Sequence, residues 1–186
     1  RRTLMLRCFS IFIFLISTSI TQASDREKII ENLQKTENLN FKFEQNINGK
    51  IENGYCTIQY PKKIFCNYEK NNDKTLVSNG KSLVIKTKSS FYRYPLNKTS
   101  LNLILDKKFL IKKINNSGKK IIDNSYINYR IIENDIEINV FFDNKTHNLI
   151  GWQTKDIYQN INFTYLSSIK VNQEIEKNLF KLPSQN

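Results

Sequence analysis

The sequence predicts a mainly β fold of the α+β type, in which one antiparallel sheet follows a short helix. Apolar and polar residues alternate with a period of two in three segments, which is typical of strands with one solvent-exposed face. Turn-forming pairs such as Asn48-Gly49 separate the apolar segments at hairpin-like intervals. No strand-like segment alternates with a long helix, so we expect an antiparallel rather than a parallel sheet.

The first element of this fold is a helix that begins near residue 24. Ser24 followed by Glu27 matches the capping-box pattern of a helix N-terminus. Ile29, Ile30 and Leu33 recur at the spacing of one helical face. We therefore expect a short amphipathic helix whose apolar face packs against the rest of the domain.

The strands follow this helix, and their apolar residues are expected to face inward. A sheet of about ten antiparallel strands must curl, which would shape these residues into the inner surface of a cup. The same residues would also form an ordinary core packed on the helices, and their pattern does not separate the two arrangements. The alternating residues are Leu39, Phe41, Phe43 and Gln45; Ile136, Ile138, Val140 and Phe142; and Ile161, Phe163 and Tyr165. The turn pairs are Asn48-Gly49, Asn53-Gly54, Asn79-Gly80, Ser117-Gly118 and Asp143-Asn144.

Two further segments complete the expected fold. Leu101, Ile104, Leu105 and Phe109 have roughly helical spacing, so residues 101–111 are predicted to form a second short helix. Residues 172–180 are predicted to form a brief helical turn or an extended tail.

Residues 1–23 are predicted to be a secretory signal peptide. Arginines precede an apolar run over residues 8–16, and Thr21-Gln22-Ala23 fits the small-x-small pattern for cleavage before Ser24. A transmembrane anchor, the alternative, needs about 20 apolar residues, and polar residues 17–19 interrupt the run. Residues 24–186 are then expected to form a single exported domain.

The composition excludes several catalytic chemistries and favours a binding protein. The chain has 186 residues, of which 39% are hydrophobic and 12% aromatic, as in globular domains. One histidine cannot build a multi-histidine metal site, and five scattered glycines do not form a phosphate-binding loop. Asp135 and Glu137 alternate along a strand, which is a solubility pattern rather than an acid-base pair. We therefore expect no enzyme activity, no metal and no cofactor.

The chain is strongly basic. Its 29 Lys and Arg against 17 Asp and Glu give a formal net charge of +12, which falls to +9 when Arg1, Arg2 and Arg7 are removed with the signal peptide. The lysines are scattered along the chain, which favours a solvated surface over a nucleic-acid site. Binding to an anionic surface stays open as an alternative function.

The two cysteines of the exported domain are predicted to form a disulfide, since disulfides persist outside the cytoplasm. Cys56 and Cys66 lie symmetrically about Pro61, in a segment that reads as two strands around a turn. Directly opposed strand residues have Cβ atoms roughly 4.5–5.5 Å apart, near the separation a disulfide needs. The alternatives are two buried free thiols or, with less support, a redox or metal site that lacks further ligands nearby.

Several segments, taken in order, resemble the LolA family of periplasmic carriers of outer-membrane lipoproteins. They are residues 39–45, Gly54 with residues 58–64, Tyr68, residues 76–83 and 94–96, and the tail from Asn172 to Pro183. The resemblance implies an incomplete antiparallel β-barrel closed by an α-helical lid around a hydrophobic cavity. It implies a monomer in the periplasm of a Gram-negative bacterium. Such a carrier takes acylated lipoproteins from an inner-membrane lipoprotein-releasing ABC transporter and hands them to an outer-membrane acceptor. A LolA-like lipid-binding sensor, or another cup protein that is not a carrier, is the alternative.

The resemblance also suggests which residues serve the cavity and its lid. The family commonly has an arginine, thought to hold the lid, before the proline of this hairpin; here Tyr60 precedes Pro61. A phenol can donate one hydrogen bond to a lid carbonyl but carries no charge, so Tyr60 is a candidate lid contact. The expected lipid-binding residues are Phe41, Phe43, Ile58, Ile64, Tyr68, Leu83 and Ile85, and the expected lid residues are Ile29, Ile30, Leu33, Leu103 and Leu105.

Overall fold

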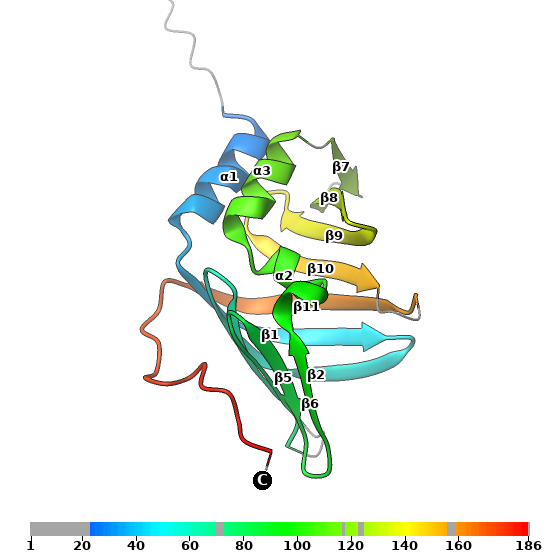
Figure 1. Ribbon diagram of the computed structural model, residues 1–186. Coiled ribbons are helices and arrows are strands. Elements are labelled where there is room, and N and C mark those ends of the chain that lie inside the picture. Colours follow the sequence, from blue (N-terminus) through cyan, green and yellow to red (C-terminus); the bar gives the residue numbers. More distant parts are fainter. Residues whose placement is uncertain (1–22, 70–72, 117, 123–124, 156–158, 186) are drawn as a thin grey trace, which may run out of the picture.

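A large antiparallel sheet with helices on one face dominates the computed structural model (Figure 1). The structure describes residues 23–69, 73–116, 118–122, 125–155 and 159–185. The signal-peptide prediction therefore falls almost wholly outside the described residues. The helical elements are α1 (Asp25–Lys35), the short 3-10 helix η1 (Leu96–Lys98), α2 (Leu101–Ile104) and α3 (Lys107–Asn116). The strands are β1 (Asn38–Ile47), β2 (Lys50–Gln59), β3 (Lys63–Tyr68), β4 (Thr75–Asn79), β5 (Ser82–Lys86), β6 (Phe91–Pro95), β7 (Lys119–Ile122), β8 (Tyr126–Glu133), β9 (Ile136–Asp143), β10 (Leu149–Lys155) and β11 (Ile161–Val171).

Nearly every strand pairs with its neighbour along the chain. The order across the eleven described strands is β6-β5-β4-β3-β2-β1-β11-β10-β9-β8-β7. The exception is the pairing of β1 with β11, which places the first and last strands side by side in the middle of the sheet. The sheet is open, with β6 and β7 as its two edges. The mainly β, antiparallel fold predicted from the sequence is confirmed.

Helix α1 begins as predicted and is fixed to the sheet at several points. The Ser24 hydroxyl accepts from the Glu27 N–H, and the Ser24 N–H donates to the Glu27 carboxylate at 2.7 Å, which completes the capping box. The Asn32 amide donates to the Thr146 carbonyl oxygen at 2.9 Å, and the Asp25 carboxylate lies 3.2 Å from the His147 ring nitrogen. Polar contacts thus hold α1 to the turn between β9 and β10.

The second helical segment is two helices rather than one. Helix α2 ends at Ile104 and α3 begins at Lys107. Asp106 separates them because its carboxylate accepts the N–H of Phe109 at 3.0 Å, which is the N-cap interaction that starts a new helix. The prediction of one helix over residues 101–111 is wrong at this break.

Strand β11 faces the opposite way from the prediction. Ile161 and Tyr165 are 47% and 50% exposed, whereas Thr164 between them is buried. Gly151 on β10 pairs with Tyr165 on one side and with Phe141 on the other. The Phe163 ring stacks on both neighbouring rings, at centroid distances of 5.1 Å to Phe141 and 4.8 Å to Tyr165. The aromatic residues of β11 therefore cover the outer surface, and Asn162 and Thr164 face inward.

The predicted turn pairs divide into true turns and one error. Asn48-Gly49 joins β1 to β2 and Asn79-Gly80 lies between β4 and β5, with Gly49 and Gly80 at the positive φ angles these turns need. Asn53-Gly54 instead lies inside β2. Asp143-Asn144 follows β9, and residue 117 of the remaining pair is outside the described residues. The C-terminal segment is extended with a turn at 177–180, which agrees with the prediction.

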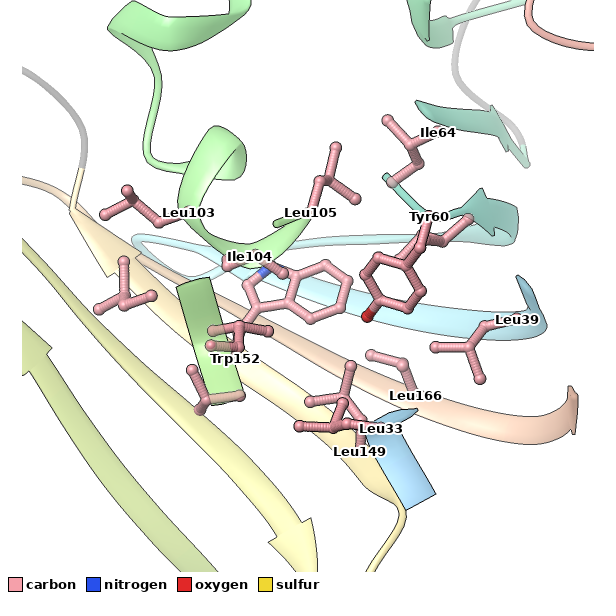
Figure 2. Packing of buried hydrophobic residues seen from close by; sticks show 14 of the residues in the cluster. Leu33, Leu39, Tyr60, Ile64, Leu103, Ile104, Leu105, Leu149, Trp152 and Leu166 are labelled. Atoms are coloured by element: carbon pink, nitrogen blue, oxygen red, sulfur yellow. The ribbon is translucent and has the colours of Figure 1, made fainter. Parts of the chain in front are cut away.

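The core lies between the inner face of the sheet and the helices. Figure 2 shows Ile104 beside the Trp152 ring, with Tyr60 next to it, and Leu103 and Leu105 belong to the same cluster. Ile104 and Leu105 are fully buried, and Leu33 of α1 joins the same cluster. Among the described residues, no helix has both the length and the apolar character needed to cross a bilayer.

Candidate functional site

A cavity of about 700 Å³ lies between the inner face of the sheet and the segment formed by η1 and α2. Its volume is within the roughly 300–1,000 Å³ range of small-molecule sites. Apolar side chains from the sheet and from one helix line most of it. They include Phe43, Ile64, Tyr68, Leu76, Leu83, Ile85, Leu101, Ile136 and Trp152.

Five of the seven side chains expected to bind lipid line this cavity: Phe43, Ile64, Tyr68, Leu83 and Ile85. Phe41 and Ile58 are buried elsewhere in the core and are not among the described residues of the cavity wall. The Phe41 ring instead packs edge-on against Trp152, with centroids 6.2 Å apart. The curl of the sheet therefore separates residues of one strand face into core and cavity wall.

Phe43 and Tyr68 form one wall of the cavity above a glycine. Gly54 pairs with Phe43 on one side and Tyr68 on the other, and the two rings meet edge to face with centroids 4.9 Å apart. Burial raises the pKa of the Tyr68 phenol, and the nearby Glu52 carboxylate raises this pKa further. Tyr68 is therefore a neutral hydrogen-bond donor at physiological pH, and its hydroxyl donates to the Gln45 amide oxygen at 3.2 Å.

The predicted disulfide is present and belongs to the cavity wall. Cys56 of β2 is bonded to Cys66 of β3, and these residues are direct partners in the strand register about Pro61. Both cysteines are buried and line the cavity. The bridge fixes the two strands that carry the apolar wall.

None of the five expected lid residues is among the described residues of the cavity wall. Ile29, Leu33, Leu103 and Leu105 are buried in the core, and Ile30 is partly buried against it. The described helical residues that line the cavity are Lys98, at the end of η1, and Leu101, at the start of α2. Leu101 opens the same apolar segment in the sequence, but periodicity alone did not distinguish it from Leu103 and Leu105.

Tyr60 shares the buried cluster of Leu103 and Leu105, yet the polar contact with this segment is made two residues later. The Tyr60 hydroxyl is buried and has no hydrogen-bond partner among the described residues, and burial raises the pKa of this phenol. The Lys62 N–H donates to the Leu105 carbonyl oxygen at 2.9 Å, and the Lys62 ammonium lies 3.3 Å from the Asp106 carboxylate. The turn between β2 and β3 therefore holds the junction of α2 and α3 through Lys62, a residue that the sequence reasoning missed.

A buried carboxylate stabilises the sheet beside this wall. Glu52 of β2 is 6% exposed and forms ion pairs with Lys74 and, at 3.0 Å, with Lys50. The Lys74 ammonium also lies 4.0 Å from the centre of the Tyr68 ring, a cation–π geometry. Burial acts to raise the pKa of Glu52, but the hydrogen bonds from Lys74 and Lys50 outweigh it and hold the pKa below its ordinary value.

Replacing Glu52 with glutamine is expected to lower the free energy of unfolding at pH 7 by about 2 kcal/mol, the scale of hydrogen bonds to charged groups. A carboxyl with a lowered folded-state pKa stabilises the protein above its ordinary pKa of about 4.3, and this contribution is lost as pH falls through the lower folded value. In urea titrations, the difference in free energy of unfolding between wild type and variant should therefore be smaller at pH 3 than at pH 7. Glu31→Gln, at an exposed pair with Lys35, is the control and should change little. An equal defect at both pH values would contradict this role of Glu52.

An open antiparallel sheet with helices over an apolar cavity is an architecture that can enclose a hydrophobic ligand. The family comparison agrees: a model described as outer membrane lipoprotein carrier protein LolA matches residues 34–183. The chain belongs to the LolA family, as the resemblance in its sequence indicated.

Solved structures extend this comparison at low sequence identity. An uncharacterized conserved protein from Thermus thermophilus is 7% identical with a TM-score of 0.51, over 87% of this chain and 96% of that one. A LolA superfamily protein from Nitrosomonas europaea is 8% identical with a TM-score of 0.44, over 86% of this chain and 99% of that one. A putative outer membrane lipoprotein-sorting protein domain from Vibrio parahaemolyticus is 7% identical with a TM-score of 0.46, over 83% of this chain and 95% of that one. No match to a curated protein was found.

Proposed function

We propose that this protein binds the acyl chains of lipoproteins in its cavity and carries them from the inner to the outer membrane. The observation that supports the proposal best is the cavity of about 700 Å³ walled by Phe43, Ile64, Leu83 and Leu101. Each methylene group removed from water contributes about 0.8 kcal/mol, so such a chamber retains an acyl chain without a covalent step. Membership of the LolA family supports the same role.

The proposed setting is the periplasm of a Gram-negative bacterium. Residues 1–23 would direct export and be removed, and residues 24–186 would act as a single domain and a monomer. An inner-membrane ABC transporter would load the protein, and an outer-membrane acceptor would unload it. The aqueous gap between two membranes is where an acyl chain needs a carrier, because exposing the chain to water is costly.

We propose further that α2 is the part of the helical layer that moves to admit a ligand. Helix α1 is held by the contacts of Asp25 and Asn32 with the turn between β9 and β10. Helix α2 has four residues, carries the cavity residue Leu101, and is held at its C-terminal end by Lys62. Displacing η1 and α2 would open the cavity while α1 stays on the sheet.

Asp106→Asn is expected to speed release of a bound acyl ligand by no more than about fivefold, the upper value for a half-exposed ion pair. Asparagine keeps the N-cap of α3 but removes the charge that faces Lys62. Stopped-flow dissociation of a fluorescent fatty acid measures the change. Lys62→Met should give the same rate, and Lys108→Met on the exposed face of α3 is the control. Release rates equal to wild type in both test variants would contradict the proposal that the Lys62–Asp106 ion pair slows release.

The carrier role is tested by purifying the protein from the periplasm and identifying what accompanies it. Acylated lipoprotein is expected to copurify with the wild-type protein and not with Leu101→Asp, which places a charge in the cavity. The matched control is Ile132→Asp, because Ile132 is 56% exposed and does not contribute to the described cavity wall. Absence of bound lipoprotein, together with normal lipoprotein localisation after depletion, would refute the proposal. Bound lipid with normal localisation would instead favour a lipid-binding sensor.

The basic charge gives less support to an anionic-surface module. Helix α3 carries four lysines, but Lys107 donates to the Thr36 carbonyl oxygen at 2.7 Å and Lys113 pairs with Glu133. These two charges serve the packing of α3 on its neighbours. The cavity therefore remains the better-supported site.

A further inference from the structure

The wall of the cavity is polar at one end. Besides Lys155 and Gln159, four uncharged polar side chains line it where β1 and β10 end and β11 begins: Gln45, Thr154, Asn162 and Thr164. They form two direct cross-strand pairs, Gln45 opposite Thr164 and Thr154 opposite Asn162. The sequence reasoning had assigned Asn162 and Thr164 to the solvent-exposed face of their strand.

Thr154 and Thr164 are buried, Gln45 and Asn162 are partly buried, and the hydrogen-bonding capacity of the four is only partly used. Thr164 is 3% exposed and Thr154 is 7% exposed. The Gln45 amide donates to the Thr164 hydroxyl at 3.2 Å, which occupies one of its two N–H donors. The side-chain oxygen of Asn162 is buried without a hydrogen-bond partner among the described residues. A buried polar atom without a partner costs free energy, so these atoms favour a ligand that supplies one.

The rest of the wall contains no comparable polar cluster among the described residues of β3, β4 and β5. Besides Tyr68 and Cys66, these three strands contribute only apolar residues to the described wall, namely Ile64, Leu76, Leu83 and Ile85. Leu101 of α2 lines the same cavity. The chamber is therefore amphiphilic. Its wall from β3, β4 and β5 is apolar, whereas hydrogen-bonding groups come from β1, β10 and β11, and also from residues 98–100, Asp135 and Glu137. An acyl derivative has the same division between a hydrocarbon tail and a carbonyl at its linkage.

We propose that Gln45, Thr154, Asn162 and Thr164 bind the carbonyl linkage, ester or amide, that joins an acyl chain to its head, and so fix the direction of the chain in the cavity. The proposal rests on the proposed function, since it assumes that the cavity holds an acyl chain. The hydroxyls of Thr154 and Thr164 and the second N–H of Gln45 can donate to a carbonyl oxygen. An amide linkage would also offer an N–H to the Asn162 oxygen. The tail then lies against Ile64, Leu83 and Leu101.

Two glycerol lipids that differ only in the carbonyl test this proposal. Monopalmitoylglycerol carries an ester, and hexadecylglycerol carries an ether with the same head and a chain of the same length. Each is used to displace a fluorescent fatty acid from the full-length protein. The wild-type protein is expected to bind the ester about tenfold more tightly, because the ether leaves the buried donors unpaired.

Isosteric variants identify the residues responsible for the preference. Thr164→Val and Thr154→Val remove a hydroxyl with little change in side-chain volume, and each should reduce the ester-to-ether preference by weakening ester binding. Gln153→Leu is the control, because Gln153 pairs with Phe163 on the outer surface of the same strand pair. Equal affinity of the wild-type protein for both lipids, or a preference kept in both valine variants, would overturn this inference alone. Failure of the wild-type protein to bind either lipid would overturn the proposed function with it.

Discussion

Gly54→Ala is expected to destabilise the protein by about 3 kcal/mol or more, which is the upper range for overpacking a core. A methyl group at position 54 would lie 2.1 Å from the Asn67 carbonyl oxygen and 2.8 Å from the Phe43 ring. The first of these contacts is with backbone, so strand β3 would have to shift. The melting temperature should fall by roughly 6–12 °C for a domain of this size.

The same substitution should weaken ligand binding, because the displaced groups belong to the cavity. Phe43 and Tyr68 are the direct partners of Gly54, and both line the wall. Thermal unfolding followed by circular dichroism, together with titration of a fluorescent fatty acid, measures the two effects. Gly118→Ala is the control, because nothing lies within 4 Å of the added methyl group there. Equal melting temperatures for Gly54→Ala and Gly118→Ala would disprove the close packing around Gly54.

Local patterns predicted the elements of this fold because the forces behind them are local. The capping box of α1 depends on two residues three positions apart, and the period of two along β1 depends only on which side of the strand meets water. The disulfide followed from the symmetry of Cys56 and Cys66 about Pro61, which the register of β2 and β3 reproduces.

The faces of β11 show where local pattern stops being informative. Alternation in Ile161, Phe163 and Tyr165 identifies a strand but does not say which side meets the core. The answer depends on partners from other strands, since Phe163 stacks on Phe141 of β9. Asn53-Gly54 failed as a turn for the same reason, because the rings that cover Gly54 come from other strands.

The site was only partly predictable because membership of the cavity wall depends on the curl of the sheet. Phe41 and Phe43 are two residues apart on one strand face, yet only Phe43 is among the described residues that line the cavity. Lys62 contacts the junction of α2 and α3 through the Leu105 carbonyl oxygen, and sequence spacing does not predict this contact. Asp106 was the signal that was available and missed, because aspartate is a strong N-cap residue that marks the break between α2 and α3.

Reduction of the Cys56–Cys66 disulfide is expected to lower the free energy of unfolding by about 3 kcal/mol, the loop-entropy value for a bridge that closes a short loop. The two cysteines are ten positions apart, so the bridge restricts only a short loop of the unfolded chain. Much of its effect on binding should instead come from the folded state. Both sulfur-bearing side chains line the cavity, and without the bond strands β2 and β3 are joined there by hydrogen bonds alone.

Urea unfolding of the wild-type protein with and without reductant measures this loss without changing a side chain. A Cys56→Ala/Cys66→Ala variant is the control, and its midpoint should be insensitive to reductant. Peptide mapping without reduction should recover the two segments as one linked species. Affinity for a fluorescent fatty acid is expected to fall on reduction by more than the small unfolded fraction explains. The reason is that the cavity wall that includes Ile64 and Phe43 is then no longer cross-linked. A reductant-sensitive midpoint with unchanged affinity would mean that hydrogen bonding and packing alone define the shape of the cavity.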